Sequence, residues 1–539
     1  MEHEIIIIGS GAAGLSAAIE LAKNDQSSYL ISEFPSQRAQ SVMAEGGINA
    51  ACNLKVDSKE LHAKETFESG RKIADFDAIL NMTRQAPKII EDLFEKGMSF
   101  SLDEDGNPDV RAFGGQSVKR TFYAASNTGK QLMHTLIEQA RRYEEKGLIQ
   151  RMTGWSFFRL LHKNNMAYGC VLVNSITQEE KVVYGKIIIA SGGLGAMFGN
   201  ATGSVKNTGA VSANLFVSGV EFANGEFIQY HPTTAKIASK NMLITEAVRG
   251  EGGRLFILKN KTPYYFMEEK YRTLGNLMPR DVVAREEWKL MKEGYQIYLD
   301  MRHLDRKIQN MKLKGVIQDC KQFLRIDPSK EAIPVEPGIH YFMGGIWVDK
   351  DHRTSMNYLY AAGECACQYH GANRLGGNSL LGAMYGGWIA ARSAMKDFPY
   401  TVMENSEIIN DIKEKDTMKT CDMIDAWKCM QNILRNGLGI IREEETIQKA
   451  ISEINELLKQ VEKSYDPSAS KAENQAVHDC ILLGKAMLLC AQERKESRGA
   501  HTRSDHKEEL EKYQKQTIAK YVDEKILIKF RKAGEKYED

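Results

Sequence analysis

The chain has 539 residues, of which 42% are hydrophobic and 27% are charged, and it carries 72 Lys and Arg against 71 Asp and Glu. At about 150 residues per domain, this length predicts two to four domains, and the average composition excludes a disordered or fibrous protein. A net charge of +1 gives no bulk electrostatic reason for the chain to bind nucleic acid or an anionic membrane.

The first elements of the chain predict a nucleotide-binding turn. Isoleucines at residues 5–8 are typical of a strand buried on both faces of a parallel sheet. Gly9, Gly11 and Gly14 follow with GxGxxG spacing, and an alanine-rich helix and a second short strand come next. Two of these glycines would admit a pyrophosphate at the helix N-terminus, and the third would let helix pack on strand. Glu33, which follows the second strand, is placed to bind a ribose hydroxyl.

Later segments predict the rest of the organisation. Residues 186–190 and 358–362 are apolar, run into glycine, and predict further strands of the same sheet. The sequence between about 225 and 345 is mixed α/β and interrupts that sheet. Residues 400–500 are rich in Lys, Glu, Leu, Ile and Met at helical spacing and predict a helical domain. The last stretch, residues 517–531, alternates weakly and predicts a hairpin.

Cysteine usage and hydropathy predict a cytoplasmic protein with no metal site of its own. The nine cysteines include no CxxC pair, which argues against a disulfide framework, a zinc site or an iron–sulfur cluster built from this chain. No apolar run approaches the roughly 20 residues that span a bilayer, so no transmembrane segment is expected. The predicted first strand begins so early that we expect no signal peptide.

Polar motifs in the middle of the chain point to chemistry rather than to structure alone. They are Gln229-Tyr230-His231-Pro232-Thr233, Thr245-Glu246 with Arg249, Pro279-Arg280-Asp281, His340 to Gly345, and His370 to Ser379. With the glycine-rich turn, this set and its order resemble the flavoprotein subunits of fumarate reductase and succinate dehydrogenase. The resemblance runs to Glu496–His501, nearly the whole chain, and L-aspartate oxidase is the nearest relative with different chemistry.

The resemblance implies a fold class, a domain plan and a cofactor. The fold is α/β: a Rossmann-like FAD-binding domain with an inserted α+β capping domain and a C-terminal helical domain. The boundaries would be 1–225 and 346–398 for the FAD-binding domain, 226–345 for the capping domain, 399–510 for the helical domain, and 511–539 for a C-terminal tail. The implied FAD-binding residues are Gly9, Ser10, Gly11, Gly14, Glu33, Gln40, Ser41, Gly46, Gly47, Glu364, Ser379 and Leu380.

The same resemblance implies a site for a C4 dicarboxylate, fumarate or succinate. Two carboxylates must be desolvated and held, which calls for cationic and hydrogen-bonding groups from separate segments. The implied substrate-binding residues are Phe113, His231, Thr245, His340 and Arg374. Arg280 would protonate one alkene carbon and would be recharged through Glu246 and Arg249.

Two departures from the family pattern favour fumarate reduction. Gln40 stands where most relatives join a histidine covalently to the flavin, and an amide is not nucleophilic enough, so FAD is expected to be non-covalent. Glu45 stands where the family usually has glutamine, and a carboxylate there would disfavour the anionic reduced flavin. A third departure, Ala210 in place of an aspartate, bears only on FAD affinity.

Several alternatives stay open. One is the flavoprotein subunit of succinate dehydrogenase, and another is L-aspartate oxidase. Against the oxidase, the neutral Gln116 beside Phe113 favours a plain dicarboxylate over an amino acid as substrate. A non-catalytic FAD-binding redox partner is a remote alternative. Whether an iron–sulfur subunit binds, and thereby attaches the chain to the inner face of the membrane, is not decided by the sequence.

Overall fold

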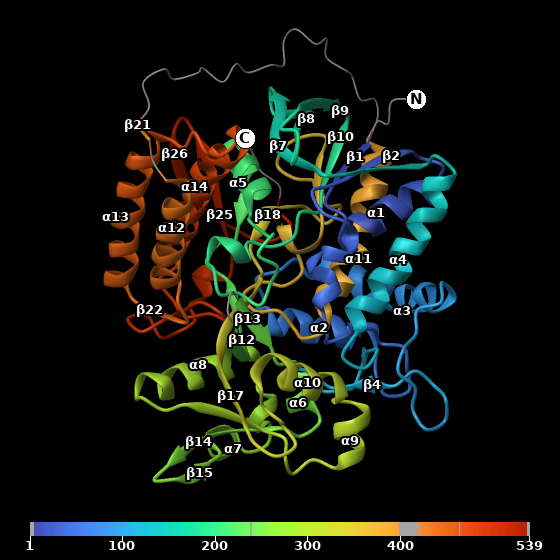
Figure 1. Cartoon of the computed structure of the whole chain (residues 1–539), viewed down its shortest axis with the longest axis vertical. Helices are drawn as coiled ribbons and strands as arrows, with labels where there is room; N and C mark the ends of the chain where they lie inside the picture. Colours follow the sequence, from blue (N-terminus) through green and yellow to red (C-terminus); the bar gives the residue numbers. More distant parts are fainter. Residues whose placement is uncertain (1–4, 238–239, 398–418, 421, 463, 536–539) are drawn as a thin grey trace.

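The structure is a computed structural model that describes residues 5–237, 240–397, 419–420, 422–462 and 464–535. Figure 1 shows three lobes: a blue and cyan lobe from the first part of the chain, a green and yellow lobe below it, and a red helical lobe at the other side. The predicted helical domain begins in residues 399–418, which lie outside the described residues.

A parallel five-stranded sheet organises the first lobe. Its order is β19-β10-β1-β2-β6, with bounds β1 (Ile5–Ile8), β2 (Ser28–Ser32), β6 (Ile149–Thr153), β10 (Lys186–Ile189) and β19 (Leu359–Ala361). All four pairings are parallel, and β1 and β10 are buried throughout. The strands predicted at residues 5–8, 29–31, 186–190 and 358–362 are therefore confirmed as neighbours in one sheet.

Helices cover one face of this sheet, and a smaller sheet packs on the other face. Helix α1 packs along α11, and the apolar faces of α3 and α4 close the same core. The bounds are α1 (Ala12–Lys23), α2 (Lys59–Ser69), α3 (Phe76–Glu95), α4 (Thr128–Glu145) and α11 (Asn378–Lys396). The smaller sheet consists of β7 (Trp155–Lys163), β8 (Met166–Asn174) and β9 (Glu180–Tyr184).

The second lobe is built on an antiparallel six-stranded sheet, in agreement with the predicted mixed α/β insertion. The sheet has the order β13-β12-β17-β16-β14-β15, and helix α8 packs on β12. The bounds are β12 (Ile228–Ile237), β13 (Lys240–Leu243), β14 (Arg254–Lys259), β15 (Thr262–Tyr264), β16 (Ile297–Asp300), β17 (Ile333–Phe342) and α8 (Arg280–Lys292).

The third lobe is helical, and the end of the chain ties it to the first. Its helices are α12 (Met423–Gly437), α13 (Glu444–Val461) and α14 (Lys471–Glu493). The predicted hairpin is confirmed as β25 (Gln516–Val522) and β26 (Lys525–Arg531). Strand β25 also pairs with β11 (Phe222–Ala223), which in turn pairs with β18 (Gly345–Trp347), so the predicted tail is part of a shared sheet. The domain boundaries themselves stay a prediction.

The remaining elements are shorter. They are β3 (Ile48–Asn49), β4 (Val110–Arg111), β5 (Thr121–Phe122), α5 (Ala210–Val217), α6 (Ala247–Gly250), α7 (Phe266–Tyr271), α9 (Arg306–Met311), α10 (Lys314–Asp319), β20 (Ala366–Cys367), β21 (Lys419–Thr420), β22 (Ile441–Arg442), β23 (Ser464–Tyr465) and β24 (Thr502–Arg503). Among the described residues, none of the helices combines the length and the hydropathy that crossing a bilayer requires.

Candidate active site

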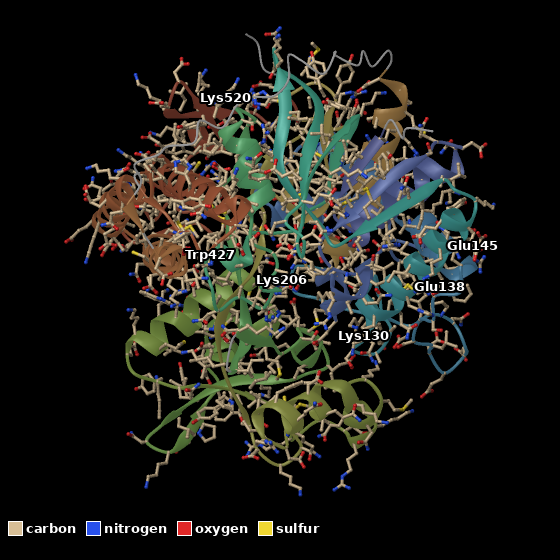
Figure 2. All side chains as sticks on the ribbon, turned by 45° about the horizontal axis from the view of Figure 1, so that its top comes forward. Lys130, Glu138, Glu145, Lys206, Trp427 and Lys520 are labelled. Carbon is tan, nitrogen blue, oxygen red and sulfur yellow. The ribbon has the colours of Figure 1, made fainter. Side chains whose placement is uncertain are left out.

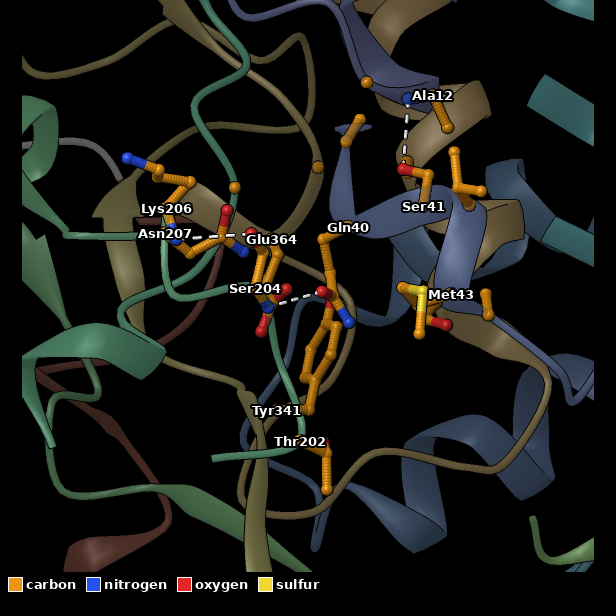
Figure 3. A pocket seen from close by; sticks show the side chains of 18 of the residues that line it. Ala12, Gln40, Ser41, Met43, Thr202, Ser204, Lys206, Asn207, Tyr341 and Glu364 are labelled. Carbon is orange, nitrogen blue, oxygen red and sulfur yellow. Dashed lines mark hydrogen bonds between the residues drawn. The ribbon is translucent and has the colours of Figure 1, made fainter. Parts of the chain in front are cut away.

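A cavity of about 720 Å³ opens where the first two lobes meet. Its wall contains every residue predicted to bind cofactor or substrate except Gly14, together with Arg280 and Glu246. Arg249 does not line the cavity; it is 1% exposed and lies behind Glu246. Figure 3 shows the middle of the cavity, with Gln40 and Ser41 on one side and Ser204 and Glu364 facing them.

The glycine-rich turn after β1 is closely packed against its neighbours and lines the cavity at Gly9 and Gly11. Gly9 has φ +110°, and a Cβ there would lie 2.2 Å from the carbonyl oxygen of Ala190. A Cβ on Gly14 would lie 1.8 Å from the carbonyl oxygen of Gly9, so this glycine serves helix packing and not the cavity. Gly11 caps α1 without a side-chain hydrogen bond, and the Ala12 N–H donates to Ser41 Oγ at 3.1 Å (Figure 3). The N-terminus of α1 therefore faces the cavity as an anion site.

The end of the cavity near Glu33 is polar and mixed in charge. Lys206, labelled near the centre of Figure 2, lines this end, and its Nζ lies 4.5 Å from the centre of the Phe34 ring. Gln40 Oε1 accepts a hydrogen bond from the Ser204 N–H at 2.6 Å (Figure 3). Burial raises the pKa of Glu364 to about 7, although its Oε1 accepts from the Phe342 N–H at 3.2 Å.

Small residues and the start of α11 shape the middle of the cavity. A Cβ on Gly46 would come within 3.2 Å of the Phe113 ring, so a larger residue would fill the space in front of that ring. Phe113 is 2% exposed, and Ser379 and Leu380 line the wall in the first turn of α11. The absence of side chains at Gly46 and Gly47 leaves space beside Phe113 that suits a planar ring.

Glu45 lines the cavity but is not the charged group that the sequence suggested. Burial, and then the negative charge of Asp319, raise its pKa from 4.5 to about 8. The side chain is therefore mostly protonated at pH 7. The expectation that a carboxylate at this position opposes the anionic reduced flavin is wrong near neutral pH and applies only above about pH 8.

Two histidines stand at the other end of the cavity as neutral hydrogen-bonding groups. The rings of His231 and His340 lie 5.0 Å apart in an edge-to-face arrangement. Burial, and then the positive charge of Arg280, hold both pKa values well below the usual 6.5. His231 Nδ1 lies 3.2 Å from both the N–H and the carbonyl oxygen of Thr233, so the backbone engages this nitrogen and fixes the orientation of the ring.

Arg280, Glu246 and Arg249 form a buried chain of charges. Arg280 contacts one carboxylate oxygen of Glu246 twice, from Nε at 2.8 Å and from Nη2 at 2.7 Å. The other oxygen accepts from the Gly114 N–H at 3.0 Å and lies 3.6 Å from Arg249 Nη2. Burial opposes ionisation of Glu246, but Arg280 and Arg249 outweigh it and lower its pKa. The order of contacts is that of the predicted relay.

Arg374 adds a further buried charge. Its guanidinium lies 4.3 Å from the centre of the Tyr341 ring, and its Nε has no hydrogen-bond partner. Burial, and then Arg280, lower its pKa to about 9, so it remains charged at pH 7. Three guanidiniums against one ionised carboxylate give the cluster of Arg249, Arg280, Arg374 and Glu246 a formal charge of +2. A buried excess of this size calls for a bound dianion.

Comparison with known proteins decides the family. Residues 4–380 match the family described as "FAD binding domain", and residues 427–536 match "Fumarate reductase flavoprotein C-term". The succinate dehydrogenase flavoprotein subunit of Bacillus subtilis is 36% identical over 97% of this chain and 94% of its own length. The fumarate reductase flavoprotein subunit of a Serratia species is 32% identical over 93% and 89%. The chain belongs to the fumarate reductase and succinate dehydrogenase flavoprotein family.

Solved structures agree with this assignment. A mutant of FrdA from E. coli quinol fumarate reductase superposes with a TM-score of 0.89 and 27% identity, covering 100% of this chain and 98% of that chain. As a member of the family, the chain is an FAD-dependent oxidoreductase, and the predicted fold class is confirmed. The glycine-rich turn, the N-terminus of α1 and the space beside Phe113 all line the cavity and fit FAD.

Three residues to which the sequence analysis assigned no role complete the site. Gln229 Oε1 accepts from Arg280 Nη1 at 3.1 Å, and Thr202 Oγ1 lies 2.7 Å from His340 Nδ1. Tyr341 lies beneath Arg374. Gln229 could have been found, because it is two residues before His231 on one strand and so shares its face. Thr202 gives no such signal, since it is distant from His340 in sequence. In the part of the chain that the structure describes, no cluster of metal-binding side chains occurs.

Proposed function

We propose that the chain is the catalytic flavoprotein subunit of a fumarate reductase, reducing fumarate to succinate with non-covalently bound FAD. The observation that carries this proposal is the buried +2 charge of the arginine cluster beside two neutral imidazoles. A dicarboxylate carries two negative charges and neutralises the +2 charge of the cluster, whereas a single carboxylate does not. The pocket thus favours a substrate with two carboxylates at a separation that both ends of the cluster can reach.

Binding is expected to hold the two carboxylates differently. Arg374 and His231 both line the cavity, and His231 is engaged by the backbone only through Nδ1, so the guanidinium and the ring Nε2 are placed to bind carboxylate oxygens. Thr245 and His340 line the same wall and supply further polar contacts. Because both imidazoles are neutral, they polarise a carboxylate without trapping it as strongly as a second ion pair would. Phe113 packs against the carbon chain and keeps water away from it.

Arg280 is the proposed proton donor. A guanidinium is a weak acid, so it can protonate a carbon only if its proton is replaced at once. Glu246 is in direct contact with Arg280 and within 3.6 Å of Arg249, which supplies that replacement. FAD, held along the glycine-rich turn and Gly46-Gly47, supplies the hydride when reduced. The chain's own contribution is therefore orientation of the dianion, exclusion of water and delivery of one proton.

The proposed direction rests on the way the cofactor is held. Gln40 replaces the histidine that would be bonded to the flavin, and its amide oxygen is already engaged by the Ser204 N–H. The resemblance implies that covalent attachment raises the flavin potential and supports succinate oxidation, so its absence favours fumarate reduction. Acid precipitation of the purified protein tests this directly: we expect the yellow colour in the supernatant, and colour retained in the pellet would contradict it.

Two other activities remain as competitors. Succinate oxidation would use the same residues in the reverse reaction, and the identity to the succinate dehydrogenase subunit of Bacillus subtilis supports this alternative. An oxidase of L-aspartate would need an acceptor for the substrate's amino group near Phe113. Gln116 does not serve this purpose, because both ends of its amide are already hydrogen-bonded within the protein. Its Oε1 accepts from the Phe113 N–H at 3.2 Å, and its Nε2 donates to Asn49 and Gly376.

A separate electron donor is part of the proposal. The chain has no CxxC motif and no cluster of its own among the described residues, so electrons must reach FAD from elsewhere. We infer an iron–sulfur subunit, the partner that the family resemblance implies, and with it a peripheral position at the inner face of the membrane. Co-purification of this chain with a subunit showing iron–sulfur absorbance would support the inference, and a donor without iron would contradict it.

The decisive assay is reduction of fumarate by reduced viologen with the purified chain. We expect fumarate reduction to exceed succinate oxidation by the same preparation and no oxygen-dependent formation of iminoaspartate from L-aspartate. Faster succinate oxidation would assign the dehydrogenase role. An FAD-loaded chain that oxidises no viologen with fumarate would favour a non-catalytic redox partner.

A further inference from the structure

A buried asparagine just outside the cavity is bonded to several segments of the site. Asn49 is 0% exposed and is not among the residues that line the cavity. Its Oδ1 accepts hydrogen bonds from Gln116 Nε2 at 3.0 Å and from Thr121 Oγ1 at 2.6 Å. Its Nδ2 donates to the carbonyl oxygen of Gly376 at 2.7 Å and to Asn378 Oδ1 at 2.8 Å. The amide thus makes all four hydrogen bonds that an asparagine side chain can make.

The first segment that Asn49 holds is the loop between Arg374 and Ser379. Besides the bond to Gly376, the backbone N–H of Asn49 donates to the carbonyl oxygen of Gly377 at 3.1 Å. Gly377 has φ +83°, and a Cβ there would lie 2.1 Å from Asn49 Oδ1, so the loop lies directly against the asparagine. Asn49 therefore fixes the backbone from which the Arg374 side chain and the first turn of α11 extend.

The second segment is the loop that carries Phe113. Gln116 Oε1 accepts from the Phe113 N–H at 3.2 Å, while Gln116 Nε2 donates to Asn49 and, at 3.1 Å, to the carbonyl oxygen of Gly376. A Cβ on Gly376 would lie 3.0 Å from Phe113, and one on Gly46 would lie 3.2 Å from the Phe113 ring. The aromatic ring is therefore packed between the two glycines, and its loop is tied to Asn49 through Gln116.

A second set of buried groups fixes the partner of Asn49. Asn378 Oδ1 lies 3.0 Å from His62 Nε2, and Asn378 Nδ2 donates to Thr66 Oγ1 at 2.9 Å. Thr66 Oγ1 in turn donates to the carbonyl oxygen of His62 at 2.8 Å. Asn378, His62 and Thr66 are all at most 1% exposed. Helix α2 therefore holds the network from behind, and a buried polar network of this kind keeps its members in one arrangement.

The spacing of these segments matters for the proposed reaction. Hydride transfer between a flavin and fumarate needs the reacting atoms about 3–3.5 Å apart. On the proposed function, Arg374 and Phe113 set the position of the substrate, whereas Gly46 and Ser379 set the position of the ring. Asn49 follows Gly46 by three residues in the chain and is hydrogen-bonded to the loops that carry the other three.

We propose that Asn49, together with Gln116, is a positioning residue that fixes the distance between the flavin ring and the substrate. The inference rests on the proposed function. Asn49 loses and gains no proton; it acts by holding the Arg374 loop and the Phe113 loop against the segment that contains Gly46. A misplacement of about 1 Å can cost roughly 100-fold in rate, so loosening of this network is measurable.

The test uses the FAD-loaded enzyme and two variants, Asn49→Ala and Gln116→Met. The matched control is Asn214→Ala, which also removes a buried amide. Asn214 Oδ1 accepts from the Leu160 N–H at 3.1 Å, its Nδ2 donates to Asp479 at 3.1 Å, and it does not line the cavity. Each protein is assayed for kcat and KM with fumarate, for flavin content and for Tm. Titration with malonate, followed by flavin absorbance, gives a Kd that does not depend on turnover.

We expect Asn49→Ala to lower kcat about tenfold and to raise KM and the malonate Kd about tenfold, with FAD retained. Gln116→Met should shift the same constants in the same direction. The double variant should lose less than the product of the two single losses, because Asn49 and Gln116 hold the same Gly376 carbonyl. Asn214→Ala should lower Tm and leave all three constants at wild-type values.

Two results would overturn the proposal. The first is wild-type kcat, KM and malonate Kd in Asn49→Ala or, if that variant does not fold, in Gln116→Met. The second is a loss that Asn214→Ala reproduces, or one that follows the loss of FAD, because either indicates fold stability alone. A wild type that binds FAD and malonate without reducing fumarate refutes the proposed function instead. The malonate Kd values then still decide whether Asn49 positions Arg374.

Discussion

Replacing Arg280 by lysine tests the catalytic assignment most sharply. Lysine keeps the positive charge, but it has one nitrogen in place of the planar group that holds Glu246 from both Nε and Nη2 and Gln229 from Nη1. The relay contact is broken, and the ammonium cannot reach the substrate carbon and Glu246 together. Loss of a general acid typically costs about 10²- to 10⁴-fold, so we expect kcat to fall by that factor, or about 3–5 kcal/mol in activation free energy.

The assay is viologen-linked fumarate reduction, with flavin absorbance measured on the same sample. Arg254→Lys is the matched control. Arg254 lies in the same lobe and also pairs with a carboxylate, with its Nε 2.7 Å from Glu268 Oε1. Its side chain is 36% exposed and lies outside the cavity. We expect the control to retain wild-type kcat. Arg280→Lys with full flavin content and a kcat near that of the wild type would refute the assignment of Arg280 as proton donor.

Three further substitutions probe other parts of the site. Arg374→Met removes a charged partner of the substrate carboxylate, and we expect KM for fumarate to rise about 30- to 150-fold, equivalent to ~2–3 kcal/mol, with FAD retained; an unchanged KM would place the carboxylate elsewhere. Gly14→Ala puts a Cβ 1.8 Å from a backbone oxygen, so the flavin-to-protein ratio should collapse, whereas Gly439→Ala, whose Cβ would have no atom nearer than 3.5 Å, should leave it intact. Glu45→Gln concerns pH: the raised pKa of about 8 means that negative charge appears only as pH rises through that value, lowering the flavin midpoint potential of the wild type there. Spectroelectrochemical titration should give equal flavin midpoint potentials for the two proteins below pH 8 and a higher potential for the variant above pH 8. Equal potentials at every pH would contradict the assignment.

The sequence predicted the parts of the fold that depend on local pattern. The isoleucines of β1, the glycine-rich turn and the alanine-rich α1 reveal a parallel sheet and a nucleotide site, because each requirement falls within a few consecutive residues. The alternating pattern of residues 517–531 predicted the hairpin β25–β26, but it did not predict the pairing of β25 with β11. That pairing joins residues almost 300 positions apart and leaves no periodic signal.

The candidate site was predictable only where side chains belong to recognisable motifs. His231, Arg280 and Arg374 sit in such motifs, and the structure brings them to one cavity. Burial is what the sequence could not supply. It makes Glu45 neutral, where its residue type suggested a charge.

A crystal structure of the FAD-loaded protein with malonate, an unreactive dicarboxylate, would locate the substrate site. We expect the ligand between the two imidazoles of His231 and His340, with its carboxylates bonded to Arg374 and next to Arg280, and with no covalent link between protein and flavin. Malonate found at any other place, or a cavity that excludes it while FAD is bound, would contradict the account.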